Sequence, residues 1–380
     1  MPRINVTRSS MPPMEEYFAE VAPLWESRWL TNAGEKHREL EAALRERLGV
    51  GDVCLFANGH LAIECAIEAL GLGSDGRDEV VTTPFTFAST THAIVRKGLR
   101  PVFADVRASD LTLDPELVER AVTPRTCAIL PVHVYGNLCD VDAIRKVADR
   151  HGLKVVYDAA HAFGVERRDP AAGEWRGAAS FGDASMLSFH ATKVFNTIEG
   201  GAVCFGDPSL RNALNRWKNF GIVGPESVEC VGGNAKMNEF CAAMGLCNLR
   251  HFDEEVAKRK AVAERYWVNL EDIPGAVALR PGEGVRPNYA YMPVLFDPEA
   301  FGSTRDEVLE ALAAEGFGTR KYFYPLVSDY ACYRDFYSSK DTPVAKRAAG
   351  RVLCLPMYAD LALEDVDKVC EIVRSCGKDA

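Results

Sequence analysis

The sequence predicts an α/β protein with a large domain built around a mainly parallel sheet and a small α+β C-terminal domain. From about residue 36 to 205, short β-branched runs alternate with stretches of helical periodicity, which is typical of helices wrapped around a parallel sheet. After Asn238 a long helical pattern continues to about Leu270, and residues 271–300 beyond it are rich in proline and glycine. This change of pattern indicates a second domain.

We place the domain boundary near residue 255, within the charged middle of the long helix. This gives a large domain over residues 1–255 and a small domain over residues 256–380. The N-terminal segment of about 30 residues is expected to pack on the small domain. Within the small domain the pattern predicts a strand at 291–296, helices near 304–314 and 344–350, and a closing helix from Leu363.

Seven short apolar runs are the candidate strands of the large domain. They cover residues 53–57, 80–83, 102–105, 128–134, 154–158, 184–189 and 202–205. Four amphipathic stretches between them are long enough to be crossover helices, at 61–70, 90–97, 115–121 and 141–151. Ligands of open α/β sheets bind beyond the carboxyl ends of the strands, so the polar residues at those ends are the candidate site residues.

The composition favours a protein that acts on small molecules. The 380 residues carry a formal charge of -10, which argues against an electrostatic grip on nucleic acid or anionic lipid. The twelve cysteines are scattered, without a C-x-x-C pair or zinc spacing, so we expect reduced thiols in a cytoplasmic protein and no metal site. No run approaches the length of a membrane span, and the first residues lack the apolar core of a signal peptide.

Two residues at strand ends indicate the chemistry. Asp158 ends the apolar run KVVYD, and Lys193 follows the run ASMLSF after three intervening residues of a turn. Alone, such an aspartate is more often a helix cap, and such a lysine is a solvated cation. Together they match what pyridoxal phosphate (PLP) requires: a lysine that forms an imine and moves a proton, and a carboxylate that keeps the pyridine nitrogen protonated.

Two further segments fit the same cofactor. Asn58-Gly59-His60 lies where the first strand turns into a helix, and backbone amides there suit a phosphate, which the hydroxyl of Ser188 can also reach. The turn TPFTFAST at 83–90 offers a phenylalanine that could cover one face of a flat ring. Without the other parts, the first segment would read as a simple turn and the phenylalanines as core.

These segments together resemble the sugar aminotransferases of the DegT/DnrJ/EryC1/StrS family. The resemblance covers residue 15 to the end, and its motifs occur in the order of the family: NGHLAIECA at 58–66, TPFTFAST at 83–90, VYDAAHAFG at 156–164, SFHATKVFNTIEGG at 188–201 and GGNAKMNE at 232–239. It implies that the large domain has the aspartate-aminotransferase-like fold of type I PLP enzymes. It also implies a homodimer with shared active sites.

By this resemblance, Lys193 forms the imine with PLP, Asp158 pairs with the pyridine nitrogen, and His161 replaces a glutamine that contacts the ring oxygen in many members. The remaining cofactor contacts that it implies are stacking by Phe87 and phosphate binding by Gly59, His60, Ser188 and, from the neighbouring subunit, Asn234. His60 stands where many members have threonine, and Ala235-Lys236 where many have Tyr-Arg. Contacts through those side chains are therefore open.

The family also suggests the reaction: glutamate supplies an amino group to a nucleotide-linked keto-sugar. The form FHATKVFNTIEGG resembles members that aminate C-4, whereas members that aminate C-3 more often have proline before Thr-Lys and GDGG after it. We therefore expect dTDP-4-keto-6-deoxyglucose as the acceptor. The candidate substrate residues are His190, Lys321, Tyr322 and Tyr324, each of which has a structural alternative.

Three alternatives stay open from the sequence. The first is amination at C-3, or of a GDP- or UDP-linked sugar, with the same fold and cofactor. The second is a non-catalytic relative that binds PLP or a sugar nucleotide, although such a protein is expected to lack Lys193 or Asp158. A nucleotide-dependent dehydrogenase is disfavoured because the glycine-rich segment GLGSDG at 71–76 follows a helix instead of opening one.

Overall fold

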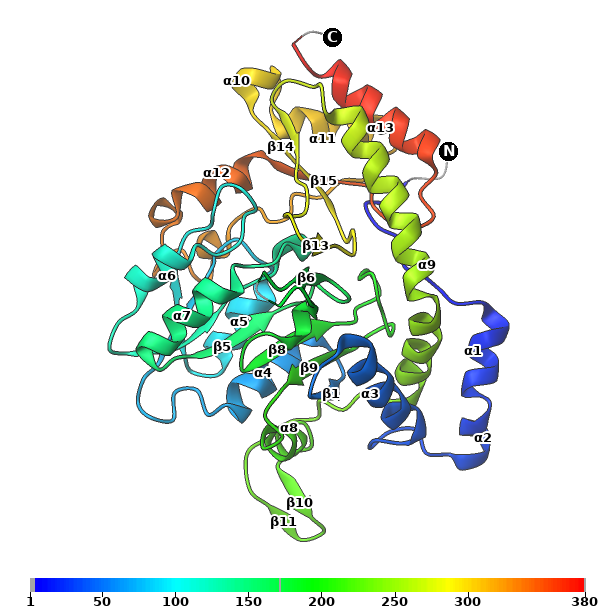
Figure 1. The fold of residues 1–380 in the computed structure, drawn as a ribbon, viewed down its shortest axis with the longest axis vertical. Coiled ribbons are helices and arrows are strands. Elements are labelled where there is room, and N and C mark those ends of the chain that lie inside the picture. The colour runs from blue at the N-terminus through cyan, green and yellow to red at the C-terminus, as the bar shows by residue number, and fades with distance from the viewer. Residues whose placement is uncertain (1–3, 171, 379–380) are drawn as a thin grey trace.

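The central feature of the computed structural model, which describes residues 4–170 and 172–378, is a seven-stranded sheet in the order β1-β9-β8-β5-β4-β2-β3 (Figure 1). β9 runs antiparallel to β1 and β8, and the other neighbours run parallel. The strands are β1 (Asp52–Phe56), β2 (Glu79–Thr82), β3 (Arg100–Phe103), β4 (Thr126–Leu130), β5 (Lys154–Asp158), β8 (Ala184–Ser188) and β9 (Gly201–Phe205). All seven correspond to predicted strands, and the predicted α/β class is confirmed.

Both faces of this sheet are covered by helices. One face packs against α4 (Gly59–Ala69), α5 (Ala88–Arg96) and α8 (Leu210–Trp217). The other packs against α6 (Pro115–Ala121), α7 (Val141–His151) and α3 (Glu35–Leu48). Neighbouring residues such as Val80 and Val81 contribute to opposite layers. Strands that are buried on both faces are apolar at consecutive positions, which is why they stand out in the sequence.

Short polar signals determine where several of these helices begin and end. The side chain of Asn58 accepts a hydrogen bond from the backbone N–H of Leu61 at 2.9 Å and so caps the start of α4. Asp140 caps α7 in the same way through the N–H of Ala143. α7 ends at Gly152, whose φ of +60° lies in the left-handed region that glycine adopts without strain.

The C-terminal part forms a smaller α+β unit. Its antiparallel sheet has the order β12-β14-β15, and its helices pack on this sheet around a separate apolar cluster. The elements are β12 (Ala276–Ala278), β14 (Met292–Phe296), β15 (Val352–Leu355), α10 (Pro298–Phe301), α11 (Arg305–Ala314), α12 (Pro343–Arg351) and α13 (Leu363–Ser375). α11 starts with a capping box between Thr304 and Glu307.

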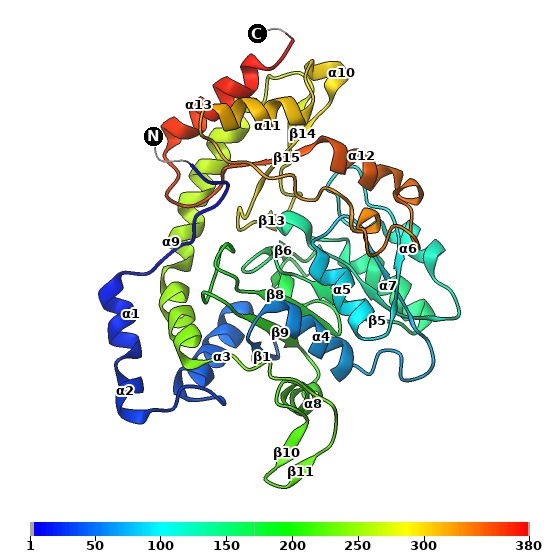
Figure 2. The ribbon, with the colours of Figure 1, turned by 180° about the vertical axis from the view of Figure 1, so that it is seen from behind.

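The long helix α9 (Glu239–Leu270) connects the two units (Figures 1 and 2). It packs against α3 in the large unit and against α13 in the small one, so it passes without a break through the boundary predicted near 255. At the N-terminus, the backbone N–H of Ile4 donates to the carbonyl of Gly316, its carbonyl accepts from Gly318, and the carbonyl of Val6 accepts from Met357, all in the small unit. The next helices, α1 (Met14–Val21) and α2 (Pro23–Ser27), bury apolar residues against the first half of α9, so the N-terminal segment packs on the small unit only at its start.

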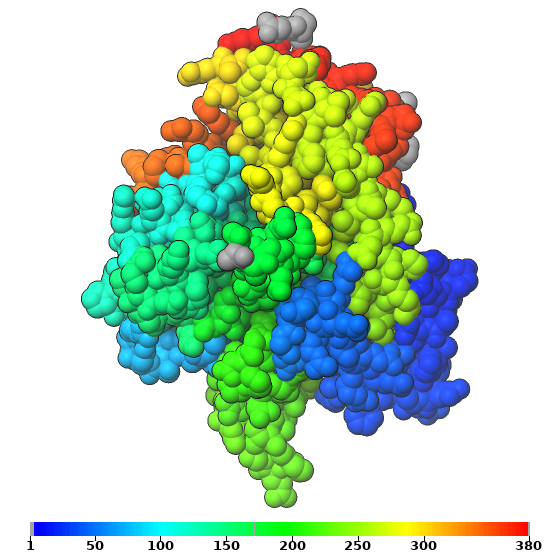
Figure 3. Space-filling model, viewed as in Figure 1, coloured from blue at the N-terminus to red at the C-terminus, as the bar shows by residue number. Residues whose placement is uncertain are grey.

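A thin arm projects from the large unit beyond α8 (Figure 3). It contains the hairpin of β10 (Ile222–Gly224) and β11 (Ser227–Val228), and a backbone bridge between Asn219 and Asn234 closes its base. The other short elements are β6 (Glu166–Arg168), β7 (Trp175–Gly177), β13 (Val285–Arg286), and the 3-10 helices η1 (Val134–Gly136), η2 (Ala178–Ser180), η3 (Val327–Asp329) and η4 (Ser339–Asp341). Among the described residues, no helix combines the length and the apolar character needed to span a bilayer.

Candidate active site

Asp158 and Lys193 lie on adjacent segments at the carboxyl ends of β5 and β8. Asp158 is the last residue of β5, and Lys193 lies in the loop that follows β8. Backbone hydrogen bonds from Phe189 to Gly200 and from Thr197 to Phe189 close this loop, and the ring of Phe195 stacks on Phe163 at 4.2 Å beneath it. The loop is therefore held by the core, and it presents Lys193 at a defined position.

The carboxylate of Asp158 is buried and has neutral hydrogen-bond donors. Its Oδ2 accepts from the hydroxyl of Thr90 at 2.7 Å, and its Oδ1 accepts from the backbone N–H of Ala160 at 3.1 Å. Burial raises the pKa of Asp158, whereas the two hydrogen bonds and the charge of Lys193 oppose that rise. A buried carboxylate in this state is ready to pair with a protonated ring nitrogen.

The side chain of Lys193 is desolvated, and this disfavours its charged form. Burial lowers the pKa of Lys193 to about 8, while the charge of Asp158 and the phenol of Tyr322 act in the opposite direction. Its Nζ donates a hydrogen bond to the hydroxyl of Tyr291 at 3.3 Å. An amine with this pKa is available both as a neutral nucleophile and as a proton carrier near neutral pH.

His161 is held in a single neutral tautomer. Its Nδ1 accepts a hydrogen bond from the backbone N–H of Tyr135 at 3.0 Å, and burial lowers the pKa of His161 well below its usual value. The proton of the neutral ring is therefore on Nε2. The ring is parallel to that of Phe323 at 5.9 Å. An Nε2–H donor fits the role expected for His161, since it can donate to an oxygen as a glutamine amide does.

The start of α4 forms a close-fitting cradle for an anion. A Cβ added at Gly59 would lie 3.0 Å from the Cβ of Ser188, so only glycine leaves room at this corner. The imidazole of His60 is directed to other partners, with Nδ1 2.9 Å from the hydroxyl of Ser89 and Nε2 3.1 Å from Glu64. His60 can therefore contribute its backbone N–H, and the cradle fits the phosphate of PLP.

Phe87 immediately precedes α5, and its side chain is 60% exposed. A phenylalanine that packs in the core would be buried, so this exposed ring is not part of the core. It is suited to stacking on a flat ligand that covers it. Together with the amine of Lys193, the carboxylate of Asp158 and the cradle at Gly59, it completes a set of groups that fits PLP.

The four predicted substrate residues are less closely grouped. Tyr322 lines a small cavity together with Thr192 and Tyr291. Lys321 instead forms an ion pair with Asp306 at 2.6 Å. The remaining two are exposed: the ring of Tyr324 lies 4.6 Å from the guanidinium of Arg305, and the Nδ1 of His190 lies 2.8 Å from the hydroxyl of Thr192. The structure thus brings only Tyr322 to the cavity beside Lys193.

Asn234 lies outside that cavity. It is exposed at the base of the arm, and the carbonyl of the next residue, Ala235, accepts a hydrogen bond from the N–H of Ala57 at 2.7 Å. The chain segment that carries Asn234 therefore runs beside the start of the phosphate cradle. Contact of its side chain with a neighbouring subunit stays a prediction.

Sequence reasoning missed several residues of the site. A second small cavity is lined by His161, Lys193 and Asn288, and it shares Thr192, Ala290 and Tyr291 with the cavity that Tyr322 lines. Tyr291 immediately precedes β14, so a search at the carboxyl ends of strands could not find it. The only signal was a polar aromatic residue at the first position of the predicted strand 291–296.

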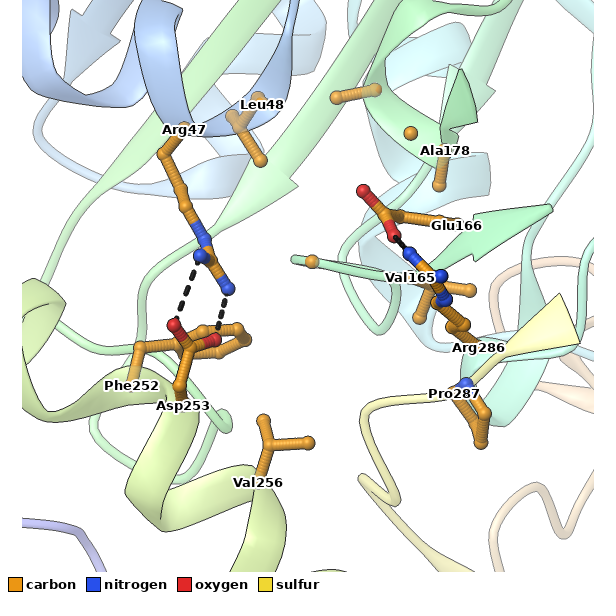
Figure 4. Close-up of a pocket in the computed structure, with 13 residues that line it drawn as sticks. Arg47, Leu48, Val165, Glu166, Ala178, Phe252, Asp253, Val256, Arg286 and Pro287 are labelled. Carbon is orange, nitrogen blue, oxygen red and sulfur yellow. Dashed lines mark hydrogen bonds and ion pairs between the residues drawn. The ribbon is translucent and has the colours of Figure 1, made fainter. Parts of the chain in front are cut away.

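A larger cavity of about 390 Å³ lies away from these residues (Figure 4). Its walls carry two ion pairs, Arg47 with Asp253 and Arg286 with Glu166, which face one another across the opening. None of the predicted site residues lines it. We therefore assign the active site to the two smaller cavities, because their walls contain predicted site residues and the walls of the larger cavity contain none.

The chain is similar to known proteins over almost its whole length. The chain matches the DegT/DnrJ/EryC1/StrS aminotransferase family over residues 13–374. It is 40% identical to a dTDP-4-amino-4,6-dideoxy-D-glucose transaminase of Shigella dysenteriae over 98% of each chain, and 39% identical to one of Escherichia coli over 97% of this chain and 98% of that one.

Solved structures show the same relationship. DesI, crystallised in the presence of its TDP-sugar product, has a TM-score of 0.92 and 36% identity, covering 99% of this chain and 93% of DesI. DesV of S. venezuelae has a TM-score of 0.88 and 30% identity, covering 99% of this chain and 98% of DesV. The predicted PLP-enzyme fold, the PLP cofactor and the class of enzyme are confirmed. The chain belongs to the DegT/DnrJ/EryC1/StrS aminotransferase family.

Proposed function

We propose that the protein is a cytoplasmic enzyme that transfers an amino group from glutamate to C-4 of dTDP-4-keto-6-deoxyglucose. The observation that carries the proposal is that a desolvated lysine, Lys193, and a buried carboxylate, Asp158, lie at the same edge of the sheet. The acceptor is supported by the names of the Shigella and Escherichia relatives and by the TDP-sugar of DesI. The glutamate donor and the cytoplasmic location rest on the sequence.

The roles of the chain's own groups follow from their positions. The chemistry that PLP supplies here is an electrophilic carbon joined to an electron-accepting ring. With PLP bound, Asp158 would keep the proton on the ring nitrogen, and the Nε2–H of His161 could donate to the ring oxygen. The amine of Lys193 would take the proton from the α-carbon of the donor and would return it to the electrophilic carbon that PLP supplies. The cradle at Gly59 and Ser188 would hold the phosphate.

The position of amination is tested with the purified protein, PLP, glutamate and dTDP-4-keto-6-deoxyglucose. We expect one new amine, located at C-4 by NMR of the product. Parallel reactions with a dTDP-3-keto-sugar and with GDP- and UDP-linked 4-keto-sugars should be slower by about 10²-fold or more, since a site that hydrogen-bonds one substrate rejects analogues that leave its polar groups unpaired. A product aminated at C-3, or faster turnover of another nucleotide sugar, would contradict the proposal.

We also infer a homodimer in which the arm of residues 219–234 contacts the second copy. The arm carries five exposed apolar side chains, Phe220, Ile222, Val223, Val228 and Val231. Such a concentration on a projecting hairpin is expected to be covered by protein in solution. Because Asn234 lies at the base of this arm, the same contact would carry it towards the neighbouring active site.

Replacing Val228 by aspartate should weaken this dimer. Val228 is 67% exposed in the single chain, and a charge buried at its place in an interface would raise the dissociation constant by about 10-fold or more. The measurement is the molar mass by light scattering over a dilution series. Val268→Asp on α9 is the matched control, because Val268 is 66% exposed and lies away from the arm. Equal behaviour of both variants would argue against the arm as the interface.

A further inference from the structure

The hydroxyl of Tyr291 is the polar group that the small unit places against the reactive lysine. Tyr291 immediately precedes β14, whereas Lys193 belongs to the loop after β8 in the large unit. The Oη of Tyr291 lies 3.3 Å from Nζ of Lys193, and within residues 4–170 and 172–378 it is the hydrogen-bond partner of that Nζ. The two cavities beside the lysine meet at Tyr291, which lines both.

The ring of Tyr291 is held by other rings of the site. Its centroid lies 4.8 Å from that of His161, 5.8 Å from that of Tyr135 and 5.9 Å from that of Tyr322. Burial raises the pKa of Tyr291, so the phenol is neutral at physiological pH. Its position is therefore determined by packing, and its hydroxyl keeps its proton through the reaction.

A neutral phenol suits a lysine that changes protonation state. When Lys193 is an ammonium, it donates to the phenol oxygen, and when it is a neutral amine, the phenol can donate to the nitrogen. A carboxylate at this position would instead stabilise only the ammonium and raise the pKa of the lysine. A hydrocarbon would leave the nitrogen of Lys193 without a partner in a desolvated site.

We propose that Tyr291 is a positioning residue that holds the amine of Lys193 in line for proton transfer in both of its protonation states. In each half-reaction the amine of Lys193 takes one proton from a carbon and, as an ammonium, returns one proton to a second carbon, so no proton is gained or lost. Tyr291 stays bonded to the nitrogen throughout. The proposal rests on the proposed role of Lys193 and does not depend on which sugar is the acceptor.

The first test uses the PLP-free protein, so it needs neither cofactor nor sugar. The pH dependence of reductive methylation of Lys193, followed by mass spectrometry, gives its apparent pKa. We expect a value near 8 in the wild type and a fall of about one pH unit in Tyr291→Phe, because the charge-assisted hydrogen bond that the ammonium donates to the phenol is stronger than the neutral one that the amine accepts, so the ammonium loses more. The other titratable groups that face Lys193, namely Asp158, His161 and Tyr322, are unchanged in this variant.

Tyr289→Phe is the matched control, because it removes a hydroxyl two residues away on a ring that faces Trp267. Its Lys193 should titrate as in the wild type. Since phenylalanine keeps the ring contacts of Tyr291, both variants should also keep the melting temperature of the PLP-free protein within about 4 °C. An unchanged apparent pKa in Tyr291→Phe would overturn the proposal.

The second test measures proton transfer with glutamate deuterated at its α-carbon. In Tyr291→Phe we expect kcat of the glutamate half-reaction to fall about 10- to 100-fold, KM to stay within about twofold, and the isotope effect to rise. Loss of rate with an unchanged isotope effect would mean that the hydroxyl serves another step, which contradicts the proposal. Failure of the sugar assignment would leave both tests unaffected, because neither contains a sugar.

Discussion

Replacement of Lys193 by alanine is expected to reduce transamination by at least about 10⁴-fold. The variant would lose both the group proposed to attach PLP covalently and the group proposed to move the proton, and among the described residues no other lysine lines the two cavities. Turnover of glutamate alone, followed by the absorbance change of the cofactor, gives this result without any sugar substrate.

Two control variants test whether the loss of activity comes from the lost charge of Lys193 or from a general effect of replacing a lysine. Lys193→Arg keeps a cation but has a pKa too high to act as a base, so it should be as inactive as alanine. Lys154→Ala, which removes a surface partner of Asp183, should retain activity within about twofold. Borohydride should trap PLP on Lys193 in the wild type, as seen by peptide mass spectrometry. Trapping on a different lysine, or residual turnover in the alanine variant above about 1%, would contradict the assigned role.

The second large effect is expected for Asp158→Asn. Asparagine keeps the size of the side chain but cannot stabilise a proton on the ring nitrogen, so we expect turnover to fall about 10³-fold and PLP affinity to fall with it. Steady-state kinetics and fluorescence titration with PLP measure the two losses. A variant that keeps more than about a tenth of the wild-type rate would show that the carboxylate does not meet the ring nitrogen.

Asp158→Asn should lower turnover, but it should not lower the thermal stability of the PLP-free protein. Burial raises the pKa of Asp158 in the folded chain, so the folded state binds this proton more tightly than the unfolded state. The group therefore favours folding below its ordinary pKa, and this contribution is lost as the pH rises through the raised value. Above that raised pKa the ionised carboxylate destabilises the folded state, so PLP-free Asp158→Asn should melt no lower than the wild type there.

Asp105 provides a matched control for this experiment, because it is also an aspartate at 5% exposure. Its oxygens accept hydrogen bonds from the backbone N–H groups of Val344 and Ala345 at the start of α12. Asp105→Asn should therefore lower the melting temperature and leave the turnover of the folded enzyme unchanged. The same behaviour for both variants would mean that Asp158 is structural.

The central sheet and its helices could be predicted well because their signals are local. The inner strands of this sheet are buried on both faces and appear as apolar runs, whereas the edge strand β3 is only partly buried. α9 was predicted almost to its ends for a similar reason, since Asn238 caps its start. The sequence did not predict β6, β7 or the strands of the arm, because strands of only two or three residues are too short to show a periodic pattern.

The substrate residues show where sequence reasoning reached its limit. Lys321 and Tyr322 are neighbours in the chain, yet one pairs with Asp306 and the other lines a cavity beside Lys193. The two residues lie at a turn, where the N–H of Tyr324 donates to the carbonyl of Lys321, and only the packing of this turn decides which side chain faces the site. No spacing rule could have separated the two.

By itself the sequence determined the α/β architecture, the family and the PLP cofactor, and it predicted the roles of Lys193 and Asp158, because these depend on apolar runs and on motifs that are contiguous in the chain. Only the tertiary structure decided which tautomer His161 adopts, how far the pKa of Lys193 falls, and that Tyr291 of the small unit meets that lysine. Each of these depends on burial or on contacts between residues that are distant in sequence. Such contacts exist only once the two units have packed together.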